Sequence, residues 1–104
     1  MKRQTFPETA KFQKTKYYVY ILLSLKDKKF YIGSTSDLKK RWGNHERGEV
    51  MSTRNRRPFT LIHYEYFINK KDALAREKYL KSGYGHQQVE SFLQKTLLGM
   101  KSTL

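Results

Sequence analysis

Cysteine is absent from this chain of 104 residues. Its absence excludes disulfide bonds, zinc sites built on thiolates and a cysteine nucleophile, and it is compatible with a reducing compartment. A glycine-rich phosphate loop and a paired-carboxylate motif are absent as well, which removes two common frameworks for catalysis. These absences leave other polar residue types, among them tyrosine, histidine, arginine, lysine, serine, threonine and isolated carboxylates, for any catalytic site.

No apolar run reaches the roughly 20 residues that a membrane span requires. The longest run, YYVYILLSL at 17–25, is rich in aromatic and β-branched residues and is followed by KDKK rather than by a small-residue cleavage site. It therefore predicts a β-strand and not a secretory signal. We expect a cytoplasmic protein that does not insert into a membrane.

Acidic residues are scarce. Asp and Glu number nine against 22 Lys and Arg, so the formal net charge at pH 7 is +13. A charge excess of this kind attracts polyanions. Because 14% of the residues are aromatic, nucleic acid is favoured over a membrane surface as the partner. We expect DNA, with RNA as a further possibility, and a monomer or weak homodimer.

Hydrophobic periodicity and turn residues divide the chain into six elements. We expect strands at 17–24, 29–34 and 59–67, and helices from Ser36 or Asp37 to Arg47, at 70–82 and at 86–98, with a break at SGYG. Ser36 or Asp37 is expected to cap the first helix and Asn69 the second. The order β-β-α-β-α-α predicts a small α+β domain whose first two strands form a hairpin. The chain would then comprise a flexible basic arm at 1–16, one domain at 17–98 and a tail at 99–104.

Alternation along the strands places Tyr20 and Tyr31 on one side of the hairpin. On spacing alone, an ordinary aromatic cross-strand pair is favoured over a functional site. On the following helix Arg41 and His45 are four residues apart and share a face, which is either a solvated basic surface or the wall of a cleft. The neighbouring Trp42 is expected to face the core.

Glu77 is the clearest anomaly in the second expected helix. At about 100° per residue it falls inside the apolar arc of Ala73, Leu74 and Leu80. A carboxylate there is costly unless a partner compensates its charge. Two interpretations stay open: a buried salt bridge with Arg41 or another neighbour, and a ligand for Mg²⁺, which prefers hard oxygen donors and keeps several waters.

These residue types suit phosphodiester hydrolysis, which needs a base, a cation for the developing negative charge and help for the leaving oxygen. At these positions the chain resembles the GIY-YIG nuclease superfamily, most of all its small single-domain bacterial branch, which is related to the N-terminal domain of a DNA-repair excinuclease. The residues that carry the resemblance are YVY at 18–20, YIG at 31–33, Arg41, His45 and Glu77. They occur in that order between residues 17 and 85.

The resemblance implies a three-stranded antiparallel sheet flanked by helices, with metal-dependent cleavage of DNA at a shallow site on one sheet face. By this analogy Tyr20 is the general base or positions the water, and Tyr31 orients water or phosphate. Arg41 stabilises the pentavalent phosphate. His45 exchanges a proton with Tyr20 or is itself the base, and Glu77 holds one Mg²⁺ or Mn²⁺.

The chain departs from the family pattern at Ser34, where some relatives carry a lysine after YIG. The missing positive charge is expected to lower activity unless Lys39, Lys40 or another cation substitutes for it. Gly33 is expected to keep space open for a phosphate, because a side chain there would project on the same face as Tyr31.

Basic residues outside the site predict contacts with the DNA backbone. They are Lys39 and Lys40 on the first helix and Arg54, Arg56 and Arg57 in the loop at 48–58. We find no segment for reading a long sequence, so structure-dependent or weakly sequence-specific cleavage is expected. The alternatives are a nucleic-acid-binding module with this fold but little or no cleavage, and a basic structural protein. The structural protein predicts a buried Tyr20 and a Glu77 paired with a cation.

Overall fold

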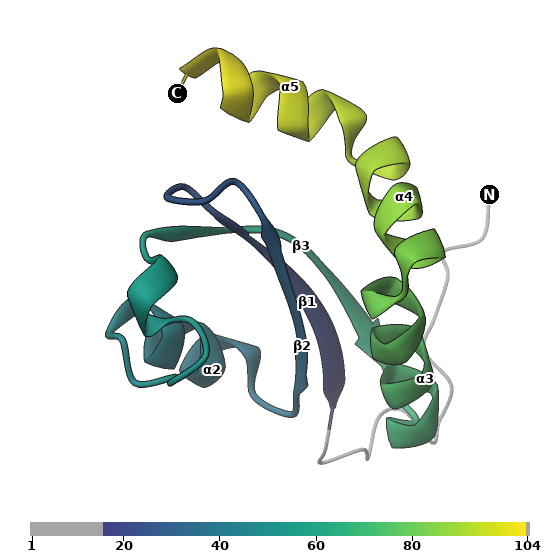
Figure 1. The fold of residues 1–104 in the computed structure, drawn as a ribbon. Helices are drawn as coiled ribbons and strands as arrows, with labels where there is room; N and C mark the ends of the chain where they lie inside the picture. Colours follow the sequence, from purple (N-terminus) through teal and green to yellow (C-terminus); the bar gives the residue numbers. More distant parts are fainter. Residues whose placement is uncertain (1–15, 104) are drawn as a thin grey trace, which may run out of the picture.

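The computed structural model of this protein describes residues 16–103, so the predicted arm at 1–16 lies, apart from Lys16, outside the described residues. At its centre is an antiparallel sheet with the strand order β2-β1-β3. The strands are β1 (Tyr17–Ser24), β2 (Phe30–Thr35) and β3 (Phe59–Phe67). The predicted α+β class and element order are confirmed, and β1 lies between its two partners (Figure 1).

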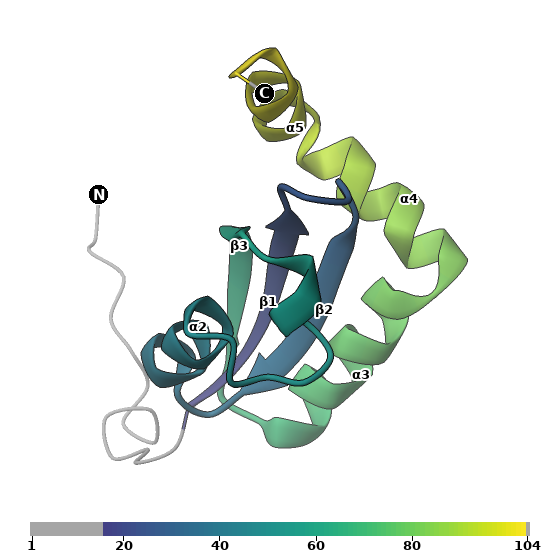
Figure 2. The same cartoon turned by 60° about the vertical axis from the view of Figure 1, so that its left-hand side comes forward.

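The first two helices begin at the residues that the sequence favours as caps. Asp37 caps α2 (Leu38–Glu46) and Asn69 caps α3 (Lys70–Lys81), each by accepting a hydrogen bond from N–H groups of the first turn. Helix α2 covers one face of the sheet and α3 the other (Figures 1 and 2). No helix within residues 16–103 is long and apolar enough to cross a membrane.

The segment predicted as one final helix contains two. Helix α4 (Gly83–Phe92) begins before the expected start at His86, and α5 (Gln94–Thr103) follows and extends beyond the expected end at 98. The break expected at SGYG is confined to Ser82, which ends α3 and caps α4, its Oγ accepting a hydrogen bond from the Gly85 N–H. The two glycines that follow lie in the first turn of α4 and not in a loop.

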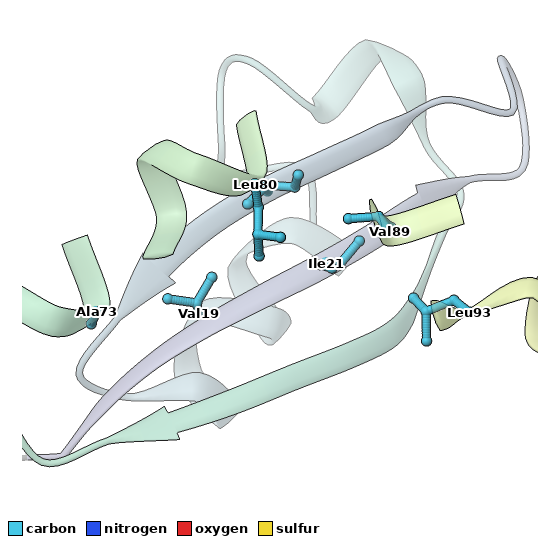
Figure 3. Close-up of a cluster of buried hydrophobic side chains, with 7 residues drawn as sticks. Val19, Ile21, Ala73, Leu80, Val89 and Leu93 are labelled. Carbon is cyan, nitrogen blue, oxygen red and sulfur yellow. The ribbon is translucent and has the colours of Figure 1, made fainter. Parts of the chain in front are cut away.

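One face of the sheet is aliphatic and packs against α3 and α4 (Figure 3). Its core comprises Val19, Ile21, Ile32, Ala73, Leu80, Val89 and Leu93. Ala73 and Leu80 share one side of α3 because seven residues make about two helical turns. Leu74 is rotated away and is 46% exposed, so the prediction that it belongs to this apolar arc is wrong.

The opposite face, which α2 covers, is aromatic and polar. The register between β1 and β3 shifts at Ile62, which has no partner residue in β1. This β-bulge turns Phe59 and Leu61 before it, and Tyr64 after it, toward the same face. Regular alternation would have put Tyr64 on the opposite face from the other two.

Candidate active site

Tyr20 lies at the centre of the aromatic face, with its ring across Gly33 of β2. The two residues are paired in the strand register, and a Cβ atom added at Gly33 would lie 2.6 Å from Tyr20 Oη. Gly33 therefore makes room for the Tyr20 side chain, whereas the sequence suggested that it makes room for a phosphate. Tyr31 lies on the same face as predicted, with its ring centroid 6.3 Å from that of Tyr20.

A chain of buried hydrogen bonds begins at the Tyr20 hydroxyl. Tyr20 Oη lies 2.8 Å from Nε2 of His45, and Nδ1 of the same ring lies 2.8 Å from Oγ1 of Thr53. Tyr20 is 1% exposed and both His45 and Thr53 are fully buried, so water does not compete for these bonds. Both ring nitrogens of His45 are thus engaged, one by the sheet and the other by the loop after α2.

The loop that carries Thr53 is fastened to the β1–β2 hairpin. The buried Ser24 Oγ donates a hydrogen bond to the carbonyl oxygen of Arg56, in the short 3-10 helix η1 (Arg54–Arg56). The Arg56 guanidinium lies 2.6 Å from the carboxylate of Asp27 and holds the pKa of that carboxyl well below its usual range. Arg56, predicted to contact DNA, is therefore engaged in anchoring this loop.

Burial shifts the proton affinities of both catalytic candidates. It raises the pKa of Tyr20 to about 12, against the opposing effect of the hydrogen bond from Arg41. Burial, and after it the positive charge of Arg41, lowers the pKa of His45 to about 4. At neutral pH the phenol is therefore protonated and the imidazole uncharged, which is the state in which a histidine can accept a proton.

Arg41 and Tyr31 form the solvent-facing rim above this buried pair. Arg41 Nε donates to Tyr20 Oη over 3.4 Å, which is long for a hydrogen bond. The Tyr31 ring centroid lies 5.0 Å from that of His45. Both rim residues are half-buried. Four of the five predicted catalytic residues are thus brought together on one face of the sheet.

Glu77 reaches the sheet from the other layer. It projects from α3, where Oε1 accepts a hydrogen bond from Ser34 Oγ at 2.7 Å and Oε2 accepts one from Lys81 Nζ at 2.8 Å. Ser34 follows Gly33 on the edge strand β2, so Glu77 lies at the sheet edge close to the site. Within the described residues, no hydrogen bond or ion pair joins it to the other four predicted catalytic residues.

At the β2 edge of the sheet, Glu77 is the carboxylate that could bind a divalent metal ion. The described part of the chain holds no group of three or more His, Cys, Asp or Glu residues that could form a protein cage. The Lys81 ammonium, whose side chain is 54% exposed, is held by an i,i+4 pair worth only about 0.2–0.5 kcal/mol. Glu77 therefore fits an ion held by one carboxylate together with waters and substrate phosphate, a mode typical of Mg²⁺.

The other predicted DNA contacts are distributed around Trp42. Lys39 lines one cavity beside α2, and Arg54 and Arg57 line a second one. Lys40 is exposed on the helix surface. Trp42 lines both cavities and is half-buried outside the main core, so the prediction that it packs into the core is wrong. His45 is the buried residue of α2 instead.

Sequence reasoning does not identify Thr53. It follows His45 by eight residues, in a segment with the composition of a basic surface loop, and threonine is a common surface residue. The available signal is the apolar pair Val50 and Met51 in this basic loop, of which Val50 is 8% and Met51 78% exposed. The burial of Val50 indicates that the loop folds back toward the sheet.

Comparison with known proteins places this geometry in a family. The model of the GIY-YIG catalytic domain matches residues 16–90. A UPF0213 protein of Clostridium perfringens is 38% identical over 81 residues, which are 77% of this chain and 86% of the relative. A UPF0213 protein of Limosilactobacillus reuteri is 37% identical over 81 residues, covering 75% of this chain and 82% of the relative.

A solved structure is also similar. The solution NMR structure of a UPF0213 protein from Bacillus halodurans is 35% identical, covers 74% of this chain and 84% of that chain, and has a TM-score of 0.48. The family match extends over most of the chain and includes all five predicted catalytic positions. The protein therefore belongs to the GIY-YIG family of catalytic domains, a nuclease superfamily.

Proposed function

We propose that the protein is a divalent-metal-dependent endonuclease that hydrolyses phosphodiester bonds in DNA, with structural or weak sequence preference. The observation that carries the proposal is the buried chain from Tyr20 through His45 to Thr53, with Arg41 directed at the same phenol. Perturbed proton affinities next to a partly exposed cation are typical of functional sites. Membership of the GIY-YIG family and the net charge of +13 support the same class of substrate.

Thr53 sets the direction of proton movement in this proposal. Its hydroxyl donates toward the Val50 carbonyl oxygen at 3.5 Å, which leaves Oγ1 free to accept the Nδ1–H of His45. Nε2 then carries a lone pair that accepts the hydroxyl proton of Tyr20. Thr53 is accordingly a positioning residue, because it acts on the tautomer of His45 and does not itself touch substrate.

The proton balance of the attack follows from this arrangement. The attacking water gives one proton to Tyr20 Oη while Tyr20 gives its own proton to Nε2 of His45. The hydroxide equivalent adds to phosphorus, Tyr20 is again neutral, and the proton resides on the imidazole. Tyr20 is thus the group that contacts the water, and His45 is the final proton acceptor.

Arg41 connects substrate binding to this proton path. Its guanidinium covers the Tyr20 hydroxyl through a bond of 3.4 Å, whereas a phosphodiester accepts shorter, charge-assisted bonds from arginine. A bound phosphate therefore draws Arg41 outward and opens the hydroxyl to water. This explains how Tyr20 can be 1% exposed in the free protein and still act in catalysis. Tyr31, on the rim, orients the phosphate or the water.

Glu77 would hold Mg²⁺ or Mn²⁺ at the edge of β2. The ion, when bound, would neutralise charge on the phosphate and the leaving oxygen. Ser34 Oγ fixes one carboxylate oxygen from the strand side, and Lys81 occupies the other with a side chain that is exposed enough to move away. Lys81 and Ser34 bind the same carboxylate, so Lys81 is a candidate to supply the positive charge that a lysine provides in some relatives.

A second candidate function is nucleic-acid binding with little or no cleavage. It is favoured by the 1% exposure of Tyr20 and by the engagement of both Glu77 carboxylate oxygens. Ser34 adds no positive charge at the site. A purely structural role for these residues makes the same two observations expected, so cleavage and binding have to be measured together to separate the three roles.

The test uses supercoiled plasmid and branched DNA, each with Mg²⁺, with Mn²⁺ or with chelator. We expect nicking that requires metal and that is lost in Glu77→Gln, a variant that keeps the shape of the side chain and an acceptor for Ser34. Glu90→Gln is the matched control, because Glu90 is an exposed carboxylate on α4 and its loss should leave cleavage unchanged. Binding without cleavage under every metal condition would favour the second function. Absence of both would leave only a structural role.

Three further expectations accompany the proposal and stay predictions. They are a preference for DNA over RNA, a monomer or weak homodimer in solution, and a cytoplasmic location. The division of the chain into an arm at 1–16, a domain at 17–98 and a tail at 99–104 also stays a prediction.

A further inference from the structure

Helix α2 separates the Tyr20 site from a groove along β3. The Tyr20 hydroxyl end lies over Gly33 on the β2 side, whereas Trp42 of the same helix faces residues of β3. Two cavities share Trp42 as a lining residue, with volumes of about 550 Å³ and about 460 Å³. We call them together the Trp42 groove. No residue of the proposed reaction lines it.

The groove follows the direction of β3. Phe59, at the start of the strand, lines the first cavity, and Leu61 and Tyr64 line the second. These residues share one face only because of the bulge at Ile62. Phe59 and Tyr64 pair with Ser24 and Tyr20, which are four residues apart on β1, so at about 3.3 Å per residue this stretch of the groove is roughly 13 Å long. The groove is therefore long enough for more than one nucleotide.

Aromatic surface is available within the groove. Tyr64 is 55% exposed, and its ring centroid lies 6.1 Å from that of Tyr18, which lines the same cavity. Trp42 and Phe59 are half-buried, so part of each ring is open to solvent. Large aromatic side chains left exposed beside cations are the usual platform on which unstacked nucleic-acid bases pack.

Positive charge accompanies these rings. Five cations line the two cavities against two carboxylates. The cations are Lys16, Lys26, Lys39, Arg54 and Arg57, and the carboxylates are Asp37 and Glu46. The Asp37 carboxylate is already engaged in capping α2. Within the described part of the chain, no side-chain hydrogen bond or ion pair engages the Lys39 ammonium or the Arg54 guanidinium.

We propose that the Trp42 groove binds an unpaired DNA strand, with bases stacked on Trp42 and Tyr64 and the backbone on Lys39, Arg54 and Arg57. The inference rests on the proposed function, since it names the part of a DNA substrate that the nuclease domain holds away from the reaction centre. A duplex keeps its base faces stacked on one another, so it can use the cations but not the rings. The groove therefore selects DNA with a single-stranded segment beside the phosphate that is cleaved.

Trp42 reports on this binding directly, because it is the single tryptophan of the chain. We titrate the protein with oligothymidine, and separately with a duplex of the same length, in the presence of chelator so that no cleavage occurs. We expect oligothymidine to quench the Trp42 fluorescence and the duplex to quench it much less. The affinity should fall steeply as salt rises, because phosphate contacts release counterions.

Two variants test the location. Tyr64→Leu removes one stacking ring and is expected to weaken binding of oligothymidine roughly 5- to 150-fold, the range that base–aromatic stacking contributes per base. Arg54→Glu reverses one charge in the groove. Lys78→Glu is its matched control, because Lys78 is exposed on α3 on the far side of the sheet, and it should weaken binding less than Arg54→Glu does.

The outcomes separate this inference from the proposed nuclease activity. Quenching by oligothymidine that is weakened in Tyr64→Leu and retained in Glu77→Gln supports the groove, even if no DNA is ever cleaved. Equal quenching by duplex and oligothymidine overturns the selectivity for unpaired DNA. Binding detected by anisotropy without a change in Trp42 fluorescence overturns the location, even if the protein proves to be an active nuclease.

Discussion

The two faces of one small sheet obey different physical requirements, although the same strand supplies both. On the aliphatic face, Val19 and Ile21 of β1 need only fill volume against α3 and α4. On the opposite face Tyr20, between them in the chain, needs a specific partner at its hydroxyl and finds it in His45. Within the described residues, no buried side-chain nitrogen or oxygen lacks a hydrogen-bond partner. Along β1, residues that contribute mainly to stability thus alternate with a residue proposed to act in catalysis. Substitutions at neighbouring positions should therefore differ in whether they lower stability or activity.

The largest effect is expected for Tyr20→Phe, which tests whether the polar face performs chemistry. The substitution removes the proton donor, and cleavage should fall about 10²- to 10⁴-fold, the usual contribution of acid–base groups. Folding should lose about 1–3 kcal/mol, because Nε2 of His45 is left without a partner. Plasmid nicking together with urea unfolding measures both quantities. Nearly full cleavage by this variant would show that Tyr20 has a structural role in packing and no catalytic role.

The neighbouring substitution Ile21→Ala tests the aliphatic face. Ile21 is fully buried, and truncating such a side chain costs about 2–5 kcal/mol through lost burial and the cavity left behind. Activity per folded molecule should be unchanged, because Ile21 points away from Tyr20. Ile21→Val, expected to cost about 0.5–1.5 kcal/mol, provides a milder variant if Ile21→Ala unfolds. A loss of specific activity without loss of stability would contradict the separation of the two faces.

Acid should destabilise the protein through His45. Burial lowers its pKa from 6.5 to about 4, so between these values the unfolded chain binds a proton that the folded chain excludes. The free energy of unfolding therefore keeps its full value with respect to His45 above pH 6.5. It decreases as pH falls from 6.5 toward 4, by about 3 kcal/mol in total. Urea unfolding across this range measures it. In His45→Gln this part of the pH dependence should disappear, and its persistence would assign the effect to other groups.

The smallest effect is expected for Thr53→Val, which keeps the shape of the side chain and removes its hydroxyl. Without an acceptor at Nδ1, the His45 ring should shift toward the Nε2–H tautomer, and cleavage should fall about tenfold, the value of one hydrogen bond. The ¹⁵N shifts of the His45 ring report the tautomer whether or not the protein cleaves DNA. Thr53→Ser should restore both properties. An Nε2–H tautomer in the unaltered protein would reverse the proposed direction of proton movement.

Local features made most of the fold predictable from sequence. The strands were identified by aromatic and β-branched runs, and the caps Asp37 and Asn69 by their side chains. The division of the last helix at Leu93 was not predictable, because the apolar stripe continues across it. The bulge at Ile62 was also missed, since a shift of register depends on the partner strand and leaves no mark in the sequence of β3 itself.

The site was predictable where spacing along one element decides it. Alternation put Tyr20 and Tyr31 on one face, and the four-residue interval put Arg41 and His45 on one side of α2. Thr53 was missed because its contact with His45 depends on how a loop folds back, for which the sequence contains little signal. The place of Glu77 in the other layer was missed for a similar reason: a helical wheel gives its angle on α3 but not the layer in which α3 lies.

The unpaired Ile62 makes part of this molecule sensitive to the place at which β3 loses a residue rather than to the kind of residue lost. Removing Ile62 itself would close the bulge and keep Phe59, Leu61 and Tyr64 on one face, because Leu61 and His63 already pair with the adjacent residues Leu22 and Ile21. Removing Thr60 instead would leave the bulge in place and turn Phe59 to the opposite face, away from Trp42. Two single-residue deletions in one strand, neither of which removes a residue with a proposed chemical role, would thus have unlike effects on the Trp42 groove.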